Sequence, residues 1–296
     1  MKEKPFSKYQ ILANVVMIIW TLAIILPFIL LFMSSITDEN TLVANGYSFF
    51  PKKFSLASYS YIIKSGGQIL KAYGVSIGVT VVGTLLNVLL SALMAYPLSV
   101  KNLPGRNAMM FFVFFTMLFN GGIVPSYIMW TGTFHIKDTI FAQLLPNFLL
   151  SAWNVMMIRT YFTTSIPDGL YEAAEIDGAS QFTIFWKIVL PLGKPILVTM
   201  GTFAGLAYWN DWTNGLYYIV KNTGLYNVQN LLNQMVQNIQ FLTQSSNSNV
   251  TAAASTIPAT GIQMAIAFVA ILPIMLIFPS FQKYYAKGIA LGAVKG

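Results

Sequence analysis

Six long apolar stretches, separated by shorter polar ones, dominate the pattern of the chain. They cover about 11–33, 73–99, 108–130, 139–162, 195–218 and 257–281. About 20 residues of helix cross a ~30 Å hydrocarbon layer. Because backbone groups in lipid must be satisfied within the segment, each stretch is predicted to be a helix. The pattern predicts an all-α integral membrane protein of six transmembrane helices, forming one domain over 1–296.

Composition and charge agree with this prediction. Of 296 residues, 56% are hydrophobic and 9% are charged, whereas roughly a quarter of the residues in soluble proteins are charged. The net charge is +8, but Lys and Arg stand singly between apolar stretches, which indicates membrane orientation and not nucleic-acid binding. Eleven of the 17 Lys and Arg residues fall on the side of the two termini, so both termini are predicted to be cytoplasmic. The first stretch is too long for a signal-peptide core and is read as an uncleaved span.

Few residues offer catalytic chemistry. There is no cysteine, and the single histidine, His135, lies in a short polar connection. A membrane-embedded hydrolase would need a nucleophile with a base or a cluster of acids and histidines, which this inventory does not supply. A secondary transporter would need intramembrane carboxylates, and Asp211 is the only acid within the six stretches. On composition alone, a structural membrane scaffold stays open.

Two apolar stretches carry polar residues at helical spacing, so each set is expected to share one helix face. In the second stretch they are Ser76, Thr80, Thr84, Asn87 and Ser91, and in the fourth Gln143, Asn147, Ser151 and Asn154. One interpretation is hydrogen bonding between packed helices. The other is a hydrated path for a polar solute, which the three amides of the fourth stretch favour more strongly.

The end of the fifth stretch combines aromatic rings, an amide and an acid. The residues are Trp209, Asn210, Asp211 and Trp212. Asp211 lies about 24 Å along a helix from Pro195, near the outer membrane interface. The tryptophans fit an aromatic belt as well as a gate, whereas an intramembrane acid suggests function. Amides with aromatic rings suit sugars, which have hydroxyl rims and apolar faces.

An acidic segment follows the fourth stretch on the predicted cytoplasmic side. Four of the nine acids lie within ten positions: Asp168, Glu172, Glu175 and Asp177. The segment 165–191 predicts a helix with Pro167 in its first turn and a stop at Gly178, then a second helix capped by Ser180 and ended by Pro191. The acids suit a basic cleft on a cytoplasmic partner. The alternative is a solvated amphipathic loop helix.

This segment resembles the EAA signature of ABC importer permeases. The matching residues are Glu172, Ala173 and Ala174, then Asp177, Gly178 and Ala179, then Ile188 with Leu190 and Pro191. Three further stretches, 120–125 beginning at Asn120, 209–212, and the tail 283–296, resemble the sugar-importing branch. The chain is therefore similar to carbohydrate uptake permeases of the maltose type (MalG-like), in the branch that imports complex oligosaccharides.

The resemblance implies a type I ABC importer permease fold in the bacterial cytoplasmic (inner) membrane and import of oligosaccharides by alternating access. It implies as partners a second permease, two copies of an ATPase, and an extracytoplasmic sugar-binding protein that meets the outer loop 219–256. Glu172 would make the ionic contact with the ATPase, and Ala173 and Ala174 would allow close approach. Gly178 would make the turn, Asp177 would cap or brace it, and Ala179 belongs to the same coupling motif. A permease for another small polar solute is the alternative.

The ATPase itself is expected on another chain. No G-x-x-x-x-G-K-[ST] phosphate loop occurs, since Gly193-Lys194 is followed by Pro195. The chain is thus expected to be a transport subunit with no cofactor of its own, while the partner ATPase binds ATP and Mg. The substrate-pathway candidates are Asn120, Gln143, Asn147, Ser151, Asn154, Trp209, Asn210, Asp211 and Trp212.

Overall fold

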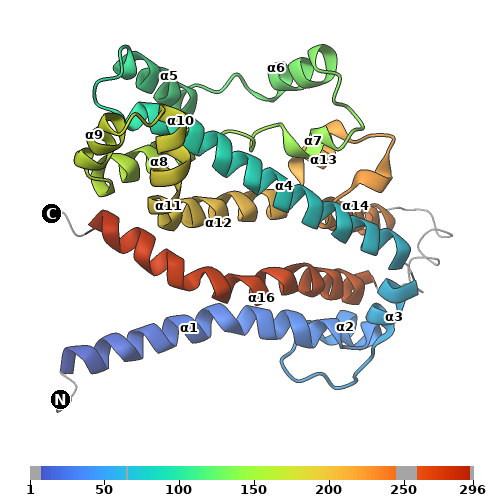
Figure 1. Cartoon of the computed structure of the whole chain (residues 1–296). Coiled ribbons are helices and arrows are strands. Elements are labelled where there is room, and N and C mark those ends of the chain that lie inside the picture. Colours follow the sequence, from blue (N-terminus) through green and yellow to red (C-terminus); the bar gives the residue numbers. More distant parts are fainter. Residues whose placement is uncertain (1–7, 65, 245–258, 294–296) are drawn as a thin grey trace. The chain divides into compact units, whose positions relative to one another are not determined.

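The computed structural model describes residues 8–64, 66–244 and 259–293 (Figure 1). The first residues of the expected last span (257–258), the outer-loop residues 245–256 and the last three residues of the tail lie outside these ranges. The helices are α1 (Lys8–Ser35), α2 (Glu39–Asn45), α3 (Ala57–Lys64), α4 (Gly66–Ser99), α5 (Arg106–Leu118), α6 (Ile123–Ile128), the π-helix η1 (Met129–Thr133), α7 (Phe141–Leu144), α8 (Ala152–Ser165), α9 (Asp168–Ile176), α10 (Gln181–Ile184), the π-helix η2 (Phe185–Val189), α11 (Leu190–Leu192), α12 (Lys194–Asn210), α13 (Thr213–Tyr218), the 3-10 helix η3 (Thr223–Leu225), α14 (Val228–Gln244) and α16 (Ala259–Ala293).

Within the described residues, three helical stretches are long and apolar enough to cross a membrane: Lys8–Ser35, Gly67–Ser99 and Thr260–Ile277. They lie at the first, second and last expected spans. Two bent helix pairs raise the number to five if each is one span, namely Arg106–Leu118 with Ile123–Thr133, and Gln181–Leu192 with Lys194–Asn210. The remaining expected span, 139–162, is divided between the short helices α7 and α8.

The third expected span is broken and not continuous. Its two parts, α5 and α6, meet at 109°. Gly122 has a φ of +84°, and the Asn120 Oδ1 accepts a hydrogen bond from the Gly122 amide at 2.8 Å. A left-handed glycine with a side-chain-bonded turn replaces the helical hydrogen bonds here, so the chain turns through more than a right angle.

The prediction of one helix over 139–162 is wrong. Between α7 and α8 the chain is irregular, and Asn147 has a φ of +67°. Pro146 has no amide to donate and disfavours a helical residue before it, which explains the interruption. Ser151 is the extended N-cap of α8, and its side chain accepts from the Asn154 amide. The four polar residues of this stretch therefore do not share one helix face.

The chain clusters into two compact units, one of residues 1–69 and 232–273, the other of 70–231 and 274–296. In the first unit, the Phe32 ring of α1 packs on Phe268 of α16 with centroids 4.9 Å apart. The Glu39 carboxylate of α2 accepts hydrogen bonds from the Thr260 and Gly261 amides at 2.9 and 2.8 Å. An acid thus caps the N-terminus of α16, where free amides and the helix dipole favour negative charge.

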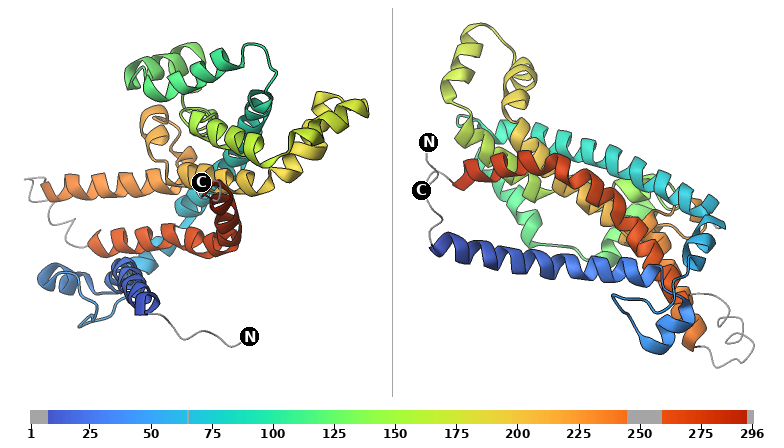
Figure 2. Two further views of the ribbon diagram at one scale, coloured as in Figure 1. Left: turned by 90° about the vertical axis from the view of Figure 1, so that its left-hand side faces the viewer. Right: turned by 90° about the horizontal axis from the view of Figure 1, so that it is seen from below.

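In the second unit, α4 and α12 carry structure at both of their ends (Figures 1 and 2). At one end α8, α9, α10 and η2 enclose an apolar core that contains Tyr96, Phe162, Phe185 and Met200. At the other end lie α7 and α13. There the Asp138 Oδ1 accepts from the amides of Val220, Lys221 and Asn222, which fixes the turn after α13.

Candidate functional site

The acidic segment forms two short helices joined by a tight turn, as expected. We call Asp168–Leu192, from α9 to α11, the coupling segment. Gly178 has a φ of +76°. Its amide bonds to the Glu175 carbonyl at 3.0 Å, and the Ala179 amide bonds to the Ala174 carbonyl at 2.9 Å. These two bonds, with Ala174 and Ala179 in one apolar cluster, make a Schellman motif, which explains why the EAA residues are followed by Asp-Gly-Ala.

One side of the coupling segment is anchored in the protein. Ala174 is 9% exposed and joins the apolar core with Ile184 and Phe185. The Gln181 amide donates to the Glu175 Oε1 at 2.7 Å, and the Tyr96 hydroxyl donates to the Gln181 Oε1 at 2.6 Å. Ser180 caps α10 by accepting from the Thr183 amide at 3.2 Å, as expected. The buried side of the turn is thus fixed by packing in the apolar core and by the hydrogen bond from Tyr96 of α4.

The opposite side is exposed and chemically mixed. Glu172, Ala173 and Asp177 are exposed, and Ile176 is 86% exposed. Asp168 pairs with Lys101. In the described part of the chain, the Glu172 and Asp177 carboxylates have neither hydrogen-bond nor ion-pair partners. Free acids beside an exposed apolar side chain on an ordered helix are typical of a surface that meets another protein.

The sequence predicted that the second helix of the coupling segment ends at Pro191, and this prediction is wrong. This helix widens into the π-helix η2, and Pro191 occupies the first turn of α11, where a missing amide costs no hydrogen bond. The chain then bends by 79° into α12. A Cβ at Gly193 would lie 2.5 Å from the Phe162 ring and 2.9 Å from the Val189 carbonyl oxygen. The bend is therefore closely packed, and it joins the coupling segment directly to α12.

Most of the predicted pathway amides lie in one group, which extends from the first turn of α8 to α7 and α13. We call this group the amide cluster: Asn87, Gln143, Asn147, Asn154, Asp211, Asn214, Asn227 and Asn230. Except for Asn147, each of these residues is at most 6% exposed. The Asn154 amide donates to the Asn87 Oδ1 at 2.7 Å, and Asn87 donates to the Phe148 carbonyl at 2.6 Å.

The rest of the amide cluster satisfies interruptions in the helices. Asn214 donates to the Pro146 carbonyl at 3.1 Å, and Asn227 donates to the Asp211 carbonyl at 2.7 Å. Gln143 donates to Asn230 and to the Leu225 carbonyl, both at 3.2 Å. Carbonyls freed by the breaks in the backbone thus receive side-chain amides. These hydrogen bonds favour a structural role for the cluster over a hydrated path.

Asp211 lies at the break between α12 and α13. Its Oδ1 accepts from the Thr213 amide at 3.0 Å, the Thr213 hydroxyl at 2.6 Å and the Asn214 amide at 3.3 Å. It therefore caps α13, as acids at helix starts do. Its Oδ2 is buried and has no hydrogen-bond partner among the described residues. The capping role of Asp211 thus accounts for its Oδ1 but not for its Oδ2.

The polar face of α4 also packs inside the protein. The Ser76 Oγ accepts from the Val228 amide at 2.9 Å. A Cβ at Gly205 of α12 would lie 3.3 Å from the Thr84 Oγ1, so α4 and α12 approach closely at these small residues. This arrangement favours helix packing for the stripe of the second span.

The other predicted pathway residues differ in their exposure. Asn120 stays in the exposed turn between α5 and α6. Trp209 is 7% exposed and faces the Tyr73 ring at 6.4 Å, whereas Asn210 and Trp212 are exposed. Sequence reasoning missed Asn227 and Asn230, which it assigned to the outer loop. Their spacing of three residues, beside the apolar residues of α14, is a helix-start signal that could have found them.

Within the ranges that the structure describes, no three His, Cys, Asp or Glu side chains gather in a group that could hold a metal ion. The exposed face of the coupling segment is the candidate for contact with another protein.

Comparison with known proteins gives consistent results. A family model described as binding-protein-dependent transport system inner membrane component matches residues 72–291. Protein LplC of Bacillus subtilis (strain 168) is 36% identical over 272 residues, which cover 92% of this chain and 90% of that protein. The polygalacturonan/rhamnogalacturonan transport system permease protein YtcP of the same strain is 36% identical over 280 residues, which cover 95% and 96%.

A solved structure resembles the whole fold. In the crystal structure of a bacterial ABC transporter involved in the import of the acidic polysaccharide alginate, one chain matches with a TM-score of 0.79 and 26% sequence identity. The match covers 96% of this chain and 100% of that chain. The fold described above is therefore similar, over nearly the whole chain, to one that is already known.

Proposed function

Because the chain belongs to the family of binding-protein-dependent transport system inner membrane components, we propose that it imports oligosaccharides by alternating access, driven by a separate ATPase that docks on the coupling segment. The chain is a permease subunit of an ATP-driven importer with the type I permease fold, and it is a transport component and not an enzyme. The observation that carries the proposal is the exposed, unpaired Glu172 on an ordered helix.

The docking surface is built for contact at close range. Ala173 adds no bulk beside Glu172, and Ile176 offers an apolar side chain one turn further on. A basic cleft on the ATPase would pair with Glu172, and an arginine there could make two parallel hydrogen bonds. In this scheme the ATPase is present in two copies, which bind ATP and Mg, and a second permease forms a heterodimer with this chain.

Movement at the coupling segment has a direct route into the protein. The segment shares one apolar core with Ile196 and Met200 of α12. The packed bend at Gly193 leaves little freedom between them. Because closely packed elements move as rigid bodies, closure of the ATPase would tilt α12 and carry the break at Asp211 with it.

The relatives support a substrate class. One is named for polygalacturonan and rhamnogalacturonan, and the similar solved transporter imports alginate. We therefore propose fragments of such polysaccharides, with uronate-containing oligosaccharides as the first class to test. In this scheme both termini are cytoplasmic, and a sugar-binding protein meets the outer loop 219–256. The pathway candidates that keep a free polar atom or an exposed side chain are Asp211, through its Oδ2, with Asn210, Trp212 and Asn120.

The test reverses the charge of the docking surface. Glu172→Lys should leave the permease folded but weaken its association with the ATPase by at least ~30-fold, since disrupting a charged pair in an interface costs about 2–5 kcal/mol. The measurements are co-purification of the ATPase with tagged permease and uptake of labelled oligogalacturonate into vesicles.

Asp168→Asn is the matched control on the same helix. Asp168 already pairs with Lys101 in an exposed ion pair, which contributes about 0–1 kcal/mol, so this variant should retain association and uptake. Full ATPase recovery with Glu172→Lys would refute the docking role. If the wild-type permease recovers the ATPase normally but takes up no oligosaccharide, the proposed substrate class is refuted instead.

A further inference from the structure

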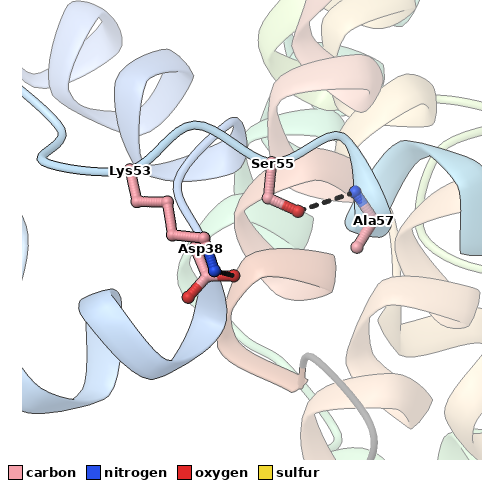
Figure 3. A network of polar contacts seen from close by, with 4 residues as sticks. All are labelled: Asp38, Lys53, Ser55 and Ala57. Carbon is pink, nitrogen blue, oxygen red and sulfur yellow. Dashed lines mark hydrogen bonds and ion pairs between the residues drawn. The ribbon is translucent and has the colours of Figure 1, made fainter.

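The loop that follows α1 is ordered by contacts between its two arms. Thr37 forms an antiparallel bridge with Phe54. The Asp38 amide donates to the Lys53 carbonyl at 3.0 Å, and the Ser55 amide donates to the Ile36 carbonyl at 2.8 Å. The Lys53 ammonium lies 3.3 Å from the Asp38 carboxylate (Figure 3). The second arm of this loop is thus fixed against the end of α1.

The length of α1 places this arm at the membrane border. Exposed apolar side chains run along α1 from Ile11 to Phe32, a rise of about 32 Å, which matches the ~30 Å hydrocarbon layer. Thr37 follows five residues later, and the Ile36 and Thr37 amides continue the helical turn by bonding to the Met33 and Ser34 carbonyls, so Thr37 lies about 8 Å beyond this border along the axis. Since Phe54 pairs with Thr37, it lies at the level of the lipid headgroups.

Apolar side chains on this loop point away from the protein. Phe50 is 85% exposed, Phe54 is 64% exposed and Leu56 is 67% exposed. An ordered loop that exposes large apolar groups marks an interaction site. Its position directly beyond α1, whose apolar window has no buried residue, makes the patch continuous with a lipid-facing surface.

The charges of the loop also suit a lipid surface. The Asp38 carboxylate is engaged by Lys53, and the Glu39 carboxylate caps α16. Lys52 is exposed, and no partner for its ammonium occurs in the described part of the chain. The charge left over is therefore positive, and a lysine beside aromatic rings is the usual combination at the membrane interface.

We propose that the second arm of this loop, residues 50–56, is an interfacial anchor that sits in the phospholipid headgroup layer on the side where α1 ends. Phe50, Phe54 and Leu56 reach the boundary with the acyl chains, and Lys52 contacts lipid phosphate. The anchor sets the depth of α1 and, through the Glu39 cap, of the start of α16. A partner protein covering the same patch is the competing outcome of the test.

The cysteine-free chain allows a direct test. Phe54→Cys and Leu56→Cys are labelled separately with an environment-sensitive fluorophore in the complete transporter. The complex is placed in nanodiscs of phosphatidylcholine and phosphatidylglycerol, with or without lipid carrying a nitroxide near the headgroup. Ile25→Cys on α1 is the lipid-facing reference, and Asn45→Cys is the polar reference within the same loop.

Both loop labels should show blue-shifted emission and lose fluorescence when the nitroxide lipid is present, approaching the loss at position 25 and exceeding that at position 45. Aqueous iodide should quench them weakly. Because both side chains are exposed, neither substitution removes a buried contact. Strong iodide quenching without lipid quenching would overturn the proposal. So would shielding from both quenchers that disappears when the permease is purified without its partners, which would indicate a protein contact. Neither readout depends on which sugar is transported.

Discussion

The coupling segment and the amide cluster are both polar regions of a largely apolar protein, and they differ in where their polar groups find partners. In the amide cluster, the side chains of Asn87, Asn154 and Asn227 bond to other groups of the same chain. On the coupling segment, Glu172 and Asp177 have no partner in the described residues. A polar group that has a hydrogen-bond partner in the same chain is accounted for by the fold. A polar group on an ordered helix without such a partner indicates a partner on another molecule.

The largest effect on folding is expected at Gly215 of α13. A Cβ there would overlap the side-chain amide of Asn230, which bonds to Gln143 and to the Trp212 carbonyl. Gly215→Ala should therefore destabilise the permease by about 3 kcal/mol or more, through overpacking and lost hydrogen bonds. Thermal unfolding in detergent measures this effect. Gly78→Ala is the control, because a Cβ at Gly78 of α4 meets nothing within 4 Å, and an equal melting temperature for both variants would contradict the role of the cluster.

Asn154→Leu tests whether the cluster is structural or lines a path. It leaves the Asn87 Oδ1 buried without its donor, which should cost about 1–3 kcal/mol. Uptake per assembled complex should stay near the wild-type level, since the Asn154 side chain is used within the protein. Reduced uptake with unchanged thermal stability would instead support the pathway interpretation and would erase the contrast between the two regions.

Two neighbouring alanines separate docking from packing within the coupling segment. Ala173→Leu adds bulk to the exposed face and should reduce ATPase co-purification while changing stability by less than about 0.5 kcal/mol. Ala174→Leu adds bulk to a residue that is 9% exposed and should destabilise the permease by about 1–3 kcal/mol. If both variants bind the ATPase equally well at the same stability, the face assigned to docking is wrong.

The smallest effect is expected at Asp138. The backbone amides of Lys221, Asn222 and Val220 hold the pKa of this carboxyl below its usual value. Because the pKa of Asp138 is lowered in the folded state, the stability that its carboxylate contributes is complete above the unfolded pKa of ~3.9. This stability is lost as the pH falls through the pKa of the folded state. The protection of the amides of residues 219–222, measured as exchange relative to the intrinsic rate at each pH, should therefore fall at acidic pH, and Asp138→Asn should remove this dependence. An unchanged pH profile in the variant would refute it.

The coupling segment was predictable because its geometry is local. Gly178 as a left-handed stop and Ser180 as a cap both follow from residues within a few positions, and the structure confirms both. The fate of Pro191 was not predictable, since a π-helix before it lets the helical run continue. The sequence rule that a proline ends a helix treats the turn before it as an ordinary α turn.

The amide cluster was not predictable, because its partners are distant in the sequence. Asn154 bonds to a residue 67 positions away, and Gln143 to one 87 positions away. Periodicity assumes an unbroken helix over 139–162, and Pro146 with the left-handed Asn147 breaks that assumption. What the pattern did predict correctly was burial: Gln143 and Asn154 avoid lipid, but inside packed protein.

The Glu39 cap has a consequence for biosynthesis. The acceptor oxygens belong to Glu39, which follows the first span. The donor amides belong to Thr260 and Gly261 at the start of the last span, 221 and 222 positions later. A ribosome delivers these groups to the membrane far apart in time. The Glu39 carboxylate therefore stays hydrated until α16 has been inserted, so the first unit reaches its native arrangement only after that step.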